Sequence, residues 1–214
     1  MAMCGGRHLE HRGCLRSRFG LRVFVSLMIA LLLAQMPPGA ARAQDLSWQV
    51  WGAVMTDNDV RQLVTFDSIR LLESGLVGFA LNTRFGRPYD LPFGQLRFEA
   101  EAQLVRHFGL QDHWEVNLPV GLRFAPRRRI LGFDSLAFLI GPSMASQIPA
   151  IELRRGGGVG SRGMVYFHVE LERQLRSDPT ARIFLRLHHR SGGYGLFANA
   201  VGTNAFAIGY RRAF

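Results

Sequence analysis

The chain has 214 residues, of which 48% are hydrophobic, and its 26 arginines outnumber its 16 acidic residues to give a formal net charge of +10. Six arginines and one acid lie in the first 43 residues, and the twenty arginines that follow are dispersed, which argues against binding to nucleic acid. Both cysteines, Cys4 and Cys14, also lie in this N-terminal segment, so residues 44–214 can form neither a disulfide nor a thiolate metal site.

The N-terminal segment has the three parts of a secretory signal peptide. Five arginines precede an apolar run, 23–33, and the small-x-small sequence 41–43 follows it. The run is shorter than the roughly 20 residues that a helix needs to span a bilayer. We therefore expect cleavage after Ala43, with residues 1–43 as the signal peptide and 44–214 as the exported domain.

Beyond residue 43, apolar residues alternate with polar or small ones, as in a β-strand with one apolar face. The third and fourth stretches are the most diagnostic, because each is charged on one side and apolar on the other. Strands of about a dozen residues are longer than the usual 5 to 6 of globular sheets. The eight expected strands are 46–56, 75–85, 95–108, 113–124, 134–146, 164–175, 182–191 and 203–214.

Two architectures fit this pattern, because the apolar side faces inward in a soluble sandwich and outward in a small membrane barrel. The strand length favours the barrel, and so do aromatic residues near strand ends, Phe108, Trp114 and Phe124. The signal peptide and the terminal Phe214 agree with it. We therefore predict an all-β fold, an eight-stranded antiparallel transmembrane β-barrel in the outer membrane of a Gram-negative cell.

The interior of an eight-stranded barrel is filled by side chains, and charges buried there need partners of opposite sign. We therefore expect inward carboxylates and arginines to form structural ion pairs that close the lumen, rather than a catalytic carboxylate pair or a channel. The carboxylates are Glu99, Glu101, Glu115, Glu170 and Glu172, and the arginines are Arg97, Arg123, Arg182 and Arg186.

The loop lengths set the expected orientation, because an even-stranded barrel has both termini and its short turns on the periplasmic side and its longer loops outside. We expect 57–74, with a short helical turn at 69–72, the glycine-rich 148–163, and 192–202 outside. The short segment 109–112 also falls outside, whereas 86–94, 125–132 and 176–180 fall on the periplasmic side.

This orientation places a possible base and nucleophile at the outer end of the seventh strand. His189 and Ser191 continue the apolar row of Ile183, Leu185 and Leu187, so both are expected to face the outer leaflet. Serine is a poor nucleophile without an adjacent base, and residues i and i+2 lie about 6.6 Å apart along a strand. The plain alternative is that both are polar residues of the membrane rim. His188 has the opposite parity and is expected in the lumen.

The sequence His189-Arg190-Ser191 near the end of a small barrel, before a turn and a final strand that ends in Phe, resembles the lipid A 3-O-deacylase family. The resemblance implies an outer-membrane esterase whose His-x-Ser motif removes an ester-linked acyl chain from lipopolysaccharide. Ser191 would be the nucleophile and His189 the base, with no metal and no cofactor. Arg190, Arg154 and Arg155 would meet the phosphates of lipid A.

The chain departs from this family at two positions. The family's asparagine after the serine, which stabilises the oxyanion, is Gly192 here, so backbone N–H groups would take that role. The family's glutamate that orients the histidine, twelve residues beyond the serine, corresponds to Thr203, with Asn204 beside it. Neither carries a charge, and Glu152 or Asn199 from the outer loops could replace that glutamate.

Two functions therefore remain open from the sequence. The first is an esterase that acts on lipid A. The second is a non-catalytic barrel that stabilises the membrane or binds lipopolysaccharide, and the missing glutamate favours it. A small porin is disfavoured by the charge-filled lumen. The sequence leaves the oligomeric state open.

Overall fold

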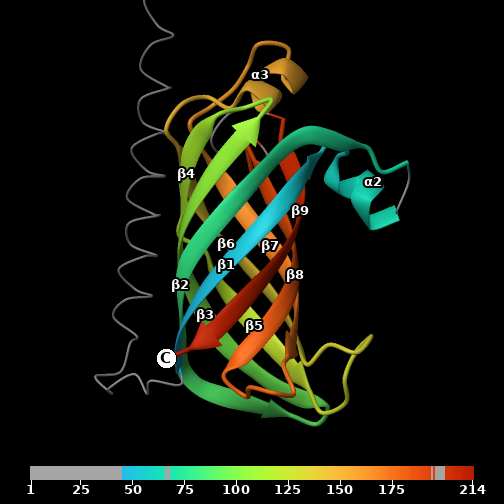
Figure 1. The fold of residues 1–214 in the computed structure, drawn as a ribbon, viewed down its shortest axis with the longest axis vertical. Helices are drawn as coiled ribbons and strands as arrows, with labels where there is room; N and C mark the ends of the chain where they lie inside the picture. Colours follow the sequence, from blue (N-terminus) through green and yellow to red (C-terminus); the bar gives the residue numbers. More distant parts are fainter. Residues whose placement is uncertain (1–44, 66–67, 194, 196–200) are drawn as a thin grey trace, which may run out of the picture. The chain divides into compact units, whose positions relative to one another are not determined.

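The computed structural model describes residues 45–65, 68–193, 195 and 201–214. These residues belong to the second of two compact units, Ala41–Phe214. The expected signal peptide, 1–43, lies outside them. The described residues form one antiparallel sheet that closes on itself as a barrel (Figure 1).

The sheet contains nine strand segments in eight positions. Its order is β2-β1-β9-β8-β7-β6-β4-β3-β5, and pairings of β2 with β3 and of β6 with β5 close the ring. β4 and β5 occupy one position, because both lie between β3 and β6. The predicted eight-stranded antiparallel barrel is therefore confirmed. The segments are β1 (Leu46–Thr56), β2 (Leu71–Leu91), β3 (Gly94–Gly109), β4 (His113–Asn117), β5 (Val120–Pro126), β6 (Ser135–Ala145), β7 (Gly163–Gln174), β8 (Ala181–Ser191) and β9 (Thr203–Ala213).

The predicted strand 113–124 is interrupted at Leu118 and Pro119, which separate β4 from β5. Proline has no backbone N–H to give to the ladder. The hydrogen bonding continues around it, since Leu118 N donates to Pro142 O at 3.1 Å and Glu101 N donates to Pro119 O at 2.9 Å. The interruption therefore leaves the barrel wall closed.

Two outer connections contain short helices, α2 (Val60–Thr65) and α3 (Ala150–Arg155), where loops were expected. α2 begins with a capping box: Gln62 N donates to Asp59 Oδ1 at 2.9 Å, and Asp59 N donates to Gln62 Oε1 at 3.1 Å. The helical turn expected at 69–72 is wrong, because β2 already begins at Leu71. No helix among the described residues is long and apolar enough to cross a membrane.

The turn expected at 86–94 is also wrong in its extent. β2 continues to Leu91 with an irregularity between Phe85 and Tyr89, and β3 starts at Gly94. The end of the barrel that holds Leu46 and Ala213 therefore has a tight hairpin here, whereas α2 and α3 lie at the opposite end (Figure 1). These lengths agree with short periplasmic turns and longer outer loops.

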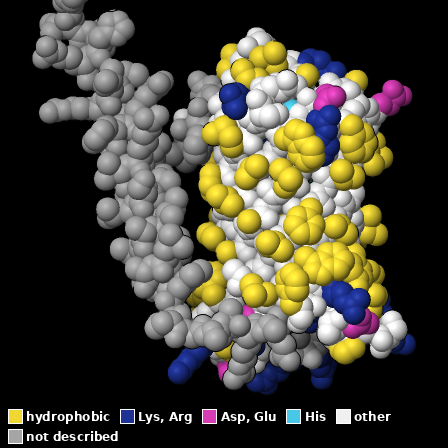
Figure 2. All heavy atoms as spheres, turned by 60° about the vertical axis from the view of Figure 1, so that its left-hand side comes forward, with side chains coloured by type: hydrophobic (Ala, Val, Ile, Leu, Met, Phe, Trp, Pro, Cys, Tyr) yellow, Lys and Arg dark blue, Asp and Glu magenta, His cyan; other side chains and the backbone are white. Residues whose placement is uncertain are grey.

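The outer wall of the barrel is apolar. Hydrophobic side chains cover its middle, and most of the charged side chains in view lie toward its two ends (Figure 2). This distribution matches an apolar band in contact with lipid. Exposed members of the band include Phe79, Leu81, Leu104, Val116, Phe138, Ile140, Leu185 and Ile208.

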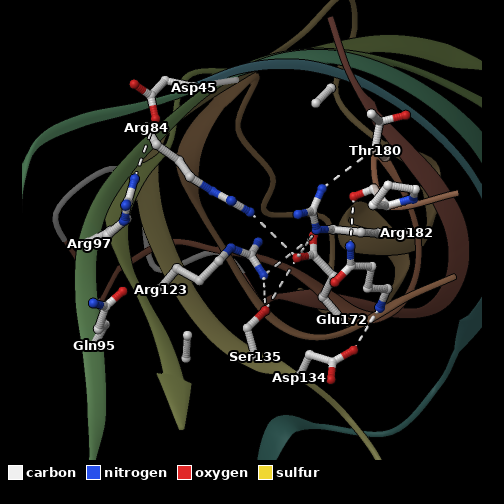
Figure 3. A pocket seen from close by; sticks show the side chains of 14 residues that line it. Asp45, Arg84, Gln95, Arg97, Arg123, Asp134, Ser135, Glu172, Thr180 and Arg182 are labelled. Carbon is white, nitrogen blue, oxygen red and sulfur yellow. Dashed lines mark hydrogen bonds and ion pairs between the residues drawn. The ribbon is translucent and has the colours of Figure 1, made fainter. Parts of the chain in front are cut away.

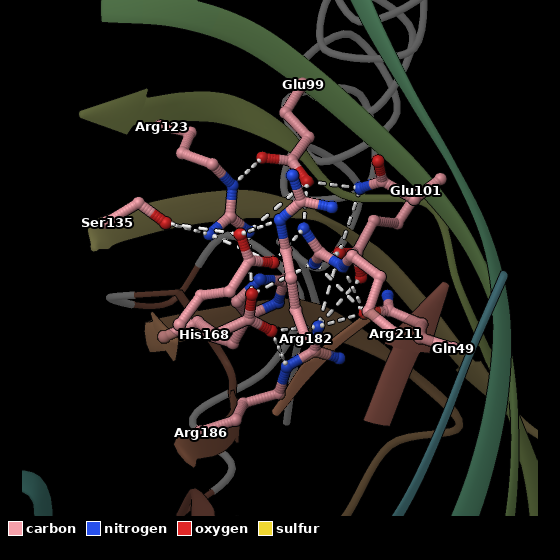
Figure 4. Close-up of polar contacts among 12 residues, drawn as sticks. Gln49, Glu99, Glu101, Arg123, Ser135, His168, Arg182, Arg186 and Arg211 are labelled. Atoms are coloured by element: carbon pink, nitrogen blue, oxygen red, sulfur yellow. Dashed lines mark hydrogen bonds and ion pairs between the residues drawn. The ribbon is translucent and has the colours of Figure 1, made fainter. Parts of the chain in front are cut away.

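The interior is filled by a network of buried ion pairs (Figure 4). Arg186 contacts Glu170 at 2.5 Å and Glu101 at 3.2 Å. Arg211, which was not among the expected arginines, contacts Glu170 at 2.9 Å. Arg123 and Arg182 pair with Glu170 and Glu172, respectively, as predicted. Arg97 was wrongly expected in this network, because it contacts Asp45 at one end of the barrel.

Candidate active site

His189 and Ser191 lie at the end of β8 that is nearer to α2 and α3 than to Leu46 and Ala213 (Figure 1). On this strand Ile183 and Leu185 are exposed on the outer wall, whereas Phe184 and Arg186 are buried. His189 and Ser191 share the parity of the exposed pair. Both residues therefore belong to the outward face of the barrel wall, at the end that holds α2 and α3.

Neighbouring strands cover the His189 ring and leave it only 7% exposed. Phe167 on β7 lies opposite His189, and the two ring centroids are 4.2 Å apart. Asn204 on β9 lies opposite it on the other side, and its Oδ1 is 2.6 Å from His189 Nδ1. Because an amide oxygen only accepts, Nδ1 carries the proton of the neutral ring, and the lone pair is on Nε2.

A second set of hydrogen bonds fixes the orientation of the Asn204 amide. Its Nδ2 donates to the backbone oxygen of Asn58 at 2.8 Å. Asn58 is held in turn, since its Oδ1 accepts from Thr56 Oγ1 at 2.7 Å and from Arg70 N at 2.6 Å. With Nδ2 engaged in this way, Oδ1 faces His189. Asn204 can therefore hold the imidazole in one tautomer and one orientation.

Thr203 does not contact His189, contrary to the expectation that it occupies the position of an orienting residue. It pairs with Arg190 across the ladder, and its hydroxyl donates to Glu152 Oε1 at 3.3 Å. Successive strand residues face opposite sides, so Asn204 is on the His189 side. From the sequence, Asn204 was only the neighbour of Thr203. Of the two expected substitutes, Glu152 is bound to Arg190, and Asn199 lies outside the described residues.

Gly202 borders both His189 and Ser191. A Cβ atom on Gly202 would lie 3.0 Å from His189 Cε1, 3.0 Å from Ser191 Cβ and 2.6 Å from Arg190 O. The absence of a side chain therefore keeps space open beside the pair. Among the described residues, no hydrogen bond joins the Ser191 hydroxyl to His189. Gly192 follows Ser191 directly and is buried.

Arg190 was expected to meet a substrate phosphate, but it faces the interior and is buried. Its Nη1 lies 2.5 Å from both carboxylate oxygens of Glu152, and its Nε donates to Ser143 Oγ at 2.9 Å. Burial raises the pKa of the Glu152 carboxyl above its ordinary value, and Arg190 opposes that shift. Arg190 therefore ties α3 to β8 and is not free to bind phosphate.

The other two arginines expected to bind phosphate lie in α3, close to the candidate site. Arg154 is exposed and Arg155 is half-buried. Arg155 Nη1 donates to Gly202 O at 3.0 Å, and its Nε is 3.9 Å from Asp57 Oδ1. The positive charge of Arg155 therefore lies next to Gly202, which borders His189 and Ser191.

A cavity of about 560 Å³ opens at the opposite end of the barrel, and its lining includes Asp45 and Ala213 (Figure 3). Its wall includes Arg84, Arg97, Arg182 and Glu172 from four strands. Neither His189 nor Ser191 lines it. The cavity and the His189–Ser191 pair are therefore separate features at different ends of the barrel.

Comparison with solved structures identifies the kind of barrel. The chain is similar to the outer membrane enzyme PagL, with a TM-score of 0.57 and 12% sequence identity over 78% of this chain and 99% of PagL. Neisserial surface protein A also matches, with a TM-score of 0.46 and 11% identity over 79% of this chain and 97% of that protein.

A further match is Ail, the attachment invasion locus protein of Yersinia pestis, solved in complex with the heparin analogue sucrose octasulfate. It has a TM-score of 0.32 and 14% identity over 78% of this chain and 97% of Ail. No protein-family model and no curated protein matches the chain. At such identities the PagL match establishes the fold alone, so the chain has the outer-membrane β-barrel fold.

Proposed function

We propose that this protein is an outer-membrane esterase that hydrolyses an ester-linked acyl chain of lipid A in the outer leaflet. Ser191 is the nucleophile, His189 the general base and Asn204 the residue that orients the base. The proposal depends above all on the 2.6 Å contact between His189 Nδ1 and Asn204 Oδ1, on the same outward face as Ser191. The PagL-like fold supports it, because PagL is an outer-membrane enzyme with this fold.

In the proposed reaction, His189 Nε2 takes the proton of the Ser191 hydroxyl as the oxygen attacks the ester carbonyl. The tetrahedral intermediate collapses to an acyl-serine, and His189 returns the proton to the leaving alcohol. Water, deprotonated by the same nitrogen, then releases the fatty acid. Backbone N–H groups at Gly192 stabilise the oxyanion. Catalytic hydrogen bonds are often loose without substrate, so the serine–histidine bond forms as the ester binds.

Asn204 orients the His189 imidazole but carries no charge. A carboxylate at this position both holds the tautomer and stabilises the imidazolium, whereas an amide provides only the first effect. The bond from Asn204 Nδ2 to Asn58 O keeps the amide in the orientation that suits the neutral base. We therefore expect slower turnover than an otherwise equal site with a carboxylate would give.

The surroundings of the pair favour an acylated, anionic lipid as substrate. Phe167 packs on Phe138 with ring centroids 5.6 Å apart, which provides an aromatic wall for an acyl chain below the site. Arg154 and Arg155 lie in α3 next to the site and provide positive charge for phosphates. Lipid A combines phosphates with ester-linked acyl chains near the membrane surface, so one molecule can use both features.

Mass spectrometry of lipid A tests this proposal. Cells that express the wild-type chain are expected to lose one hydroxyacyl chain from lipid A, whereas cells with Ser191→Ala at matched outer-membrane levels keep it. Ser146→Ala, at an exposed serine of the same rim, is the matched control and is expected to behave as wild type. Identical lipid A with wild type and Ser191→Ala would contradict the proposal and favour a non-catalytic barrel that stabilises the membrane or binds lipopolysaccharide.

A further inference from the structure

A second cluster of reactive side chains lies inside the barrel, toward its outer end, and takes no part in the proposed reaction. His107 on β3 pairs directly with His113 on β4, and Glu115 lies two residues further along β4. His188 reaches the same carboxylate from β8. All four side chains are buried, each with at most 2% exposure.

The carboxylate of Glu115 lies between two imidazoles. Its Oε2 is 3.0 Å from His107 Nε2, and its Oε1 is 3.3 Å from His188 Nε2. The His107 and His113 rings are stacked, with centroids 4.1 Å apart and planes 12° from parallel. Three imidazoles from three strands therefore surround one buried carboxylate.

This cluster contains nitrogen atoms without partners. Within the described part of the chain, neither ring nitrogen of His113 has a hydrogen-bond partner, and neither does Nδ1 of His188. Leaving a buried polar group unpaired costs about 1–3 kcal/mol, so such groups need an explanation. A bound cation would explain the unpaired nitrogens, because it would accept a lone pair from His113.

We propose that His107, His113, Glu115 and His188 form a binding site for a divalent transition-metal ion, with Zn²⁺ as the first choice. The ligand atoms of His107, His113 and Glu115 already lie within 4.8 Å of one another. Small rotations bring them to the bond lengths of about 2.0–2.2 Å that zinc forms with imidazole and carboxylate. Three nitrogens and one oxygen suit tetrahedral zinc, whereas Mg²⁺ and Ca²⁺ prefer oxygen ligands.

Gln111 provides the outer hydrogen bond that a histidine ligand needs. Its amide nitrogen is 2.9 Å from His107 Nδ1, and its Oε1 is buried without a partner. Rotating this amide by half a turn lets Oε1 accept a proton from His107 Nδ1. That change leaves His107 Nε2 free to bind the metal, and such partners fix the tautomer of metal-bound histidines.

The local charges also favour a cation at this cluster. Arg190 Nε lies 3.9 Å from Glu115 Oε2, and the Arg190 guanidinium is already bound by both oxygens of Glu152. Within the described residues, a second buried group with metal-ligand spacing consists of Glu101, His168 and Glu170, and its surroundings are different. Its carboxylates contact Arg186 and Arg211, so arginines supply the positive charge there.

A metal at this site links β3 and β4 to β8 across the lumen, directly behind the proposed active site, because His188 precedes His189. The role is structural, since the buried cluster faces away from the lipid side. Metal uptake then accompanies folding, because the ligands are enclosed in the finished barrel. This inference does not depend on the proposed esterase activity.

The test is to refold the purified protein in detergent, with Zn²⁺ or with a chelator, and to measure zinc per barrel after desalting. We expect about one ion per wild-type barrel and a higher melting temperature with the metal. Refolding with Co²⁺ should give the visible absorption bands of a tetrahedral site. Heat-dependent migration in gels reports whether each variant has folded.

His113→Ala is expected to weaken Zn²⁺ binding by more than tenfold, and His188→Ala, on another strand, repeats the test if the first variant does not fold. His168→Ala removes a buried lumen histidine outside the cluster and should keep the ion. Wild-type barrels without zinc after refolding would overturn the inference, and so would equal binding by His113→Ala. Loss of the ion in His168→Ala alone would place the metal elsewhere.

Discussion

The side chain that most changes the interpretation of the site is Asn204. The spacing from Ser191 pointed to Thr203, one residue earlier, which faces the interior. The parity of His189 and Ser191 could be read from β8 itself, because alternation is local to a strand. Their partner on β9 depends on the register between two strands, which the alternation within one strand does not encode.

Asn204→Ala is expected to lower kcat for ester hydrolysis by about 10- to 100-fold with little change in KM, because the base loses its orientation while substrate contacts remain. Steady-state kinetics on lipid A measure both constants. Thr203→Ala is the matched control, since Thr203 is adjacent in sequence but contacts Glu152. The opposite ranking, with Thr203→Ala the slower variant, would contradict the assignment of Asn204.

Gly202 provides a test of the open space beside His189 and Ser191. A Cβ atom there meets Arg190 O at 2.6 Å and crowds both His189 and Ser191. Gly202→Ala is therefore expected to reduce activity by about tenfold or more through displacement of the pair. Gly52→Ala adds the same atom where nothing lies within 4 Å and should leave the rate unchanged. Activity assays on the two purified variants test this prediction. Equal rates for Gly202→Ala and Gly52→Ala would show that the space beside Ser191 is not needed.

The sequence did not predict α3, and this helix matters to the candidate site. The segment 148–163 read as a glycine-rich loop, and its six-residue helix is too short to give a clear periodic pattern. Its attachment depends on Glu152, which reaches Arg190 between the two proposed catalytic residues. The sequence could not show this contact, because the partners are 38 residues apart and on different elements.

Glu152→Gln should release α3 from the barrel. Arg190 would then be buried without a full counter-charge, and breaking a buried pair in this way costs about 3–5 kcal/mol. Limited trypsin digestion should therefore cleave after Arg154 and Arg155 much faster in the variant than in the wild type. Glu73→Gln, at an exposed position, is the control and should be digested at the wild-type rate. Unchanged protection of Glu152→Gln would show that the ion pair does not hold α3.

The barrel architecture could be predicted almost completely from the sequence. Strict alternation in strands such as β3 fixed which face is apolar, and eight strands implied a lumen filled by paired charges. The particular pairs were less accessible, because Arg211 contacts carboxylates more than 40 residues away. The short breaks and extensions of strands, such as the one at Pro119, depend on local pairing that alternation does not encode.

The filled lumen predicts that the barrel does not conduct ions. Arg186 on β8 and Arg211 on β9 reach across the interior to Glu101 and Glu99 on β3, and Arg123 on β5 contacts Glu170 on β7 (Figure 4). Planar-bilayer recordings of the purified protein should therefore show no stable channel steps at either polarity. A known outer-membrane porin, reconstituted in the same way, is the positive control. Reproducible single-channel steps from this protein would contradict the closed network.

If Ser191 is a nucleophile activated by His189, it should react with a fluorophosphonate, and this labelling requires no knowledge of the natural substrate. Activated serines displace fluoride from this reagent and keep the phosphonyl group. Peptide mass spectrometry of the folded wild-type barrel should find the label on Ser191. His189→Ala should stay unlabelled, and Thr203→Ala should be labelled as the wild type is. A wild-type barrel in which Ser191 remains unlabelled would contradict the esterase and leave a non-catalytic barrel as the better account.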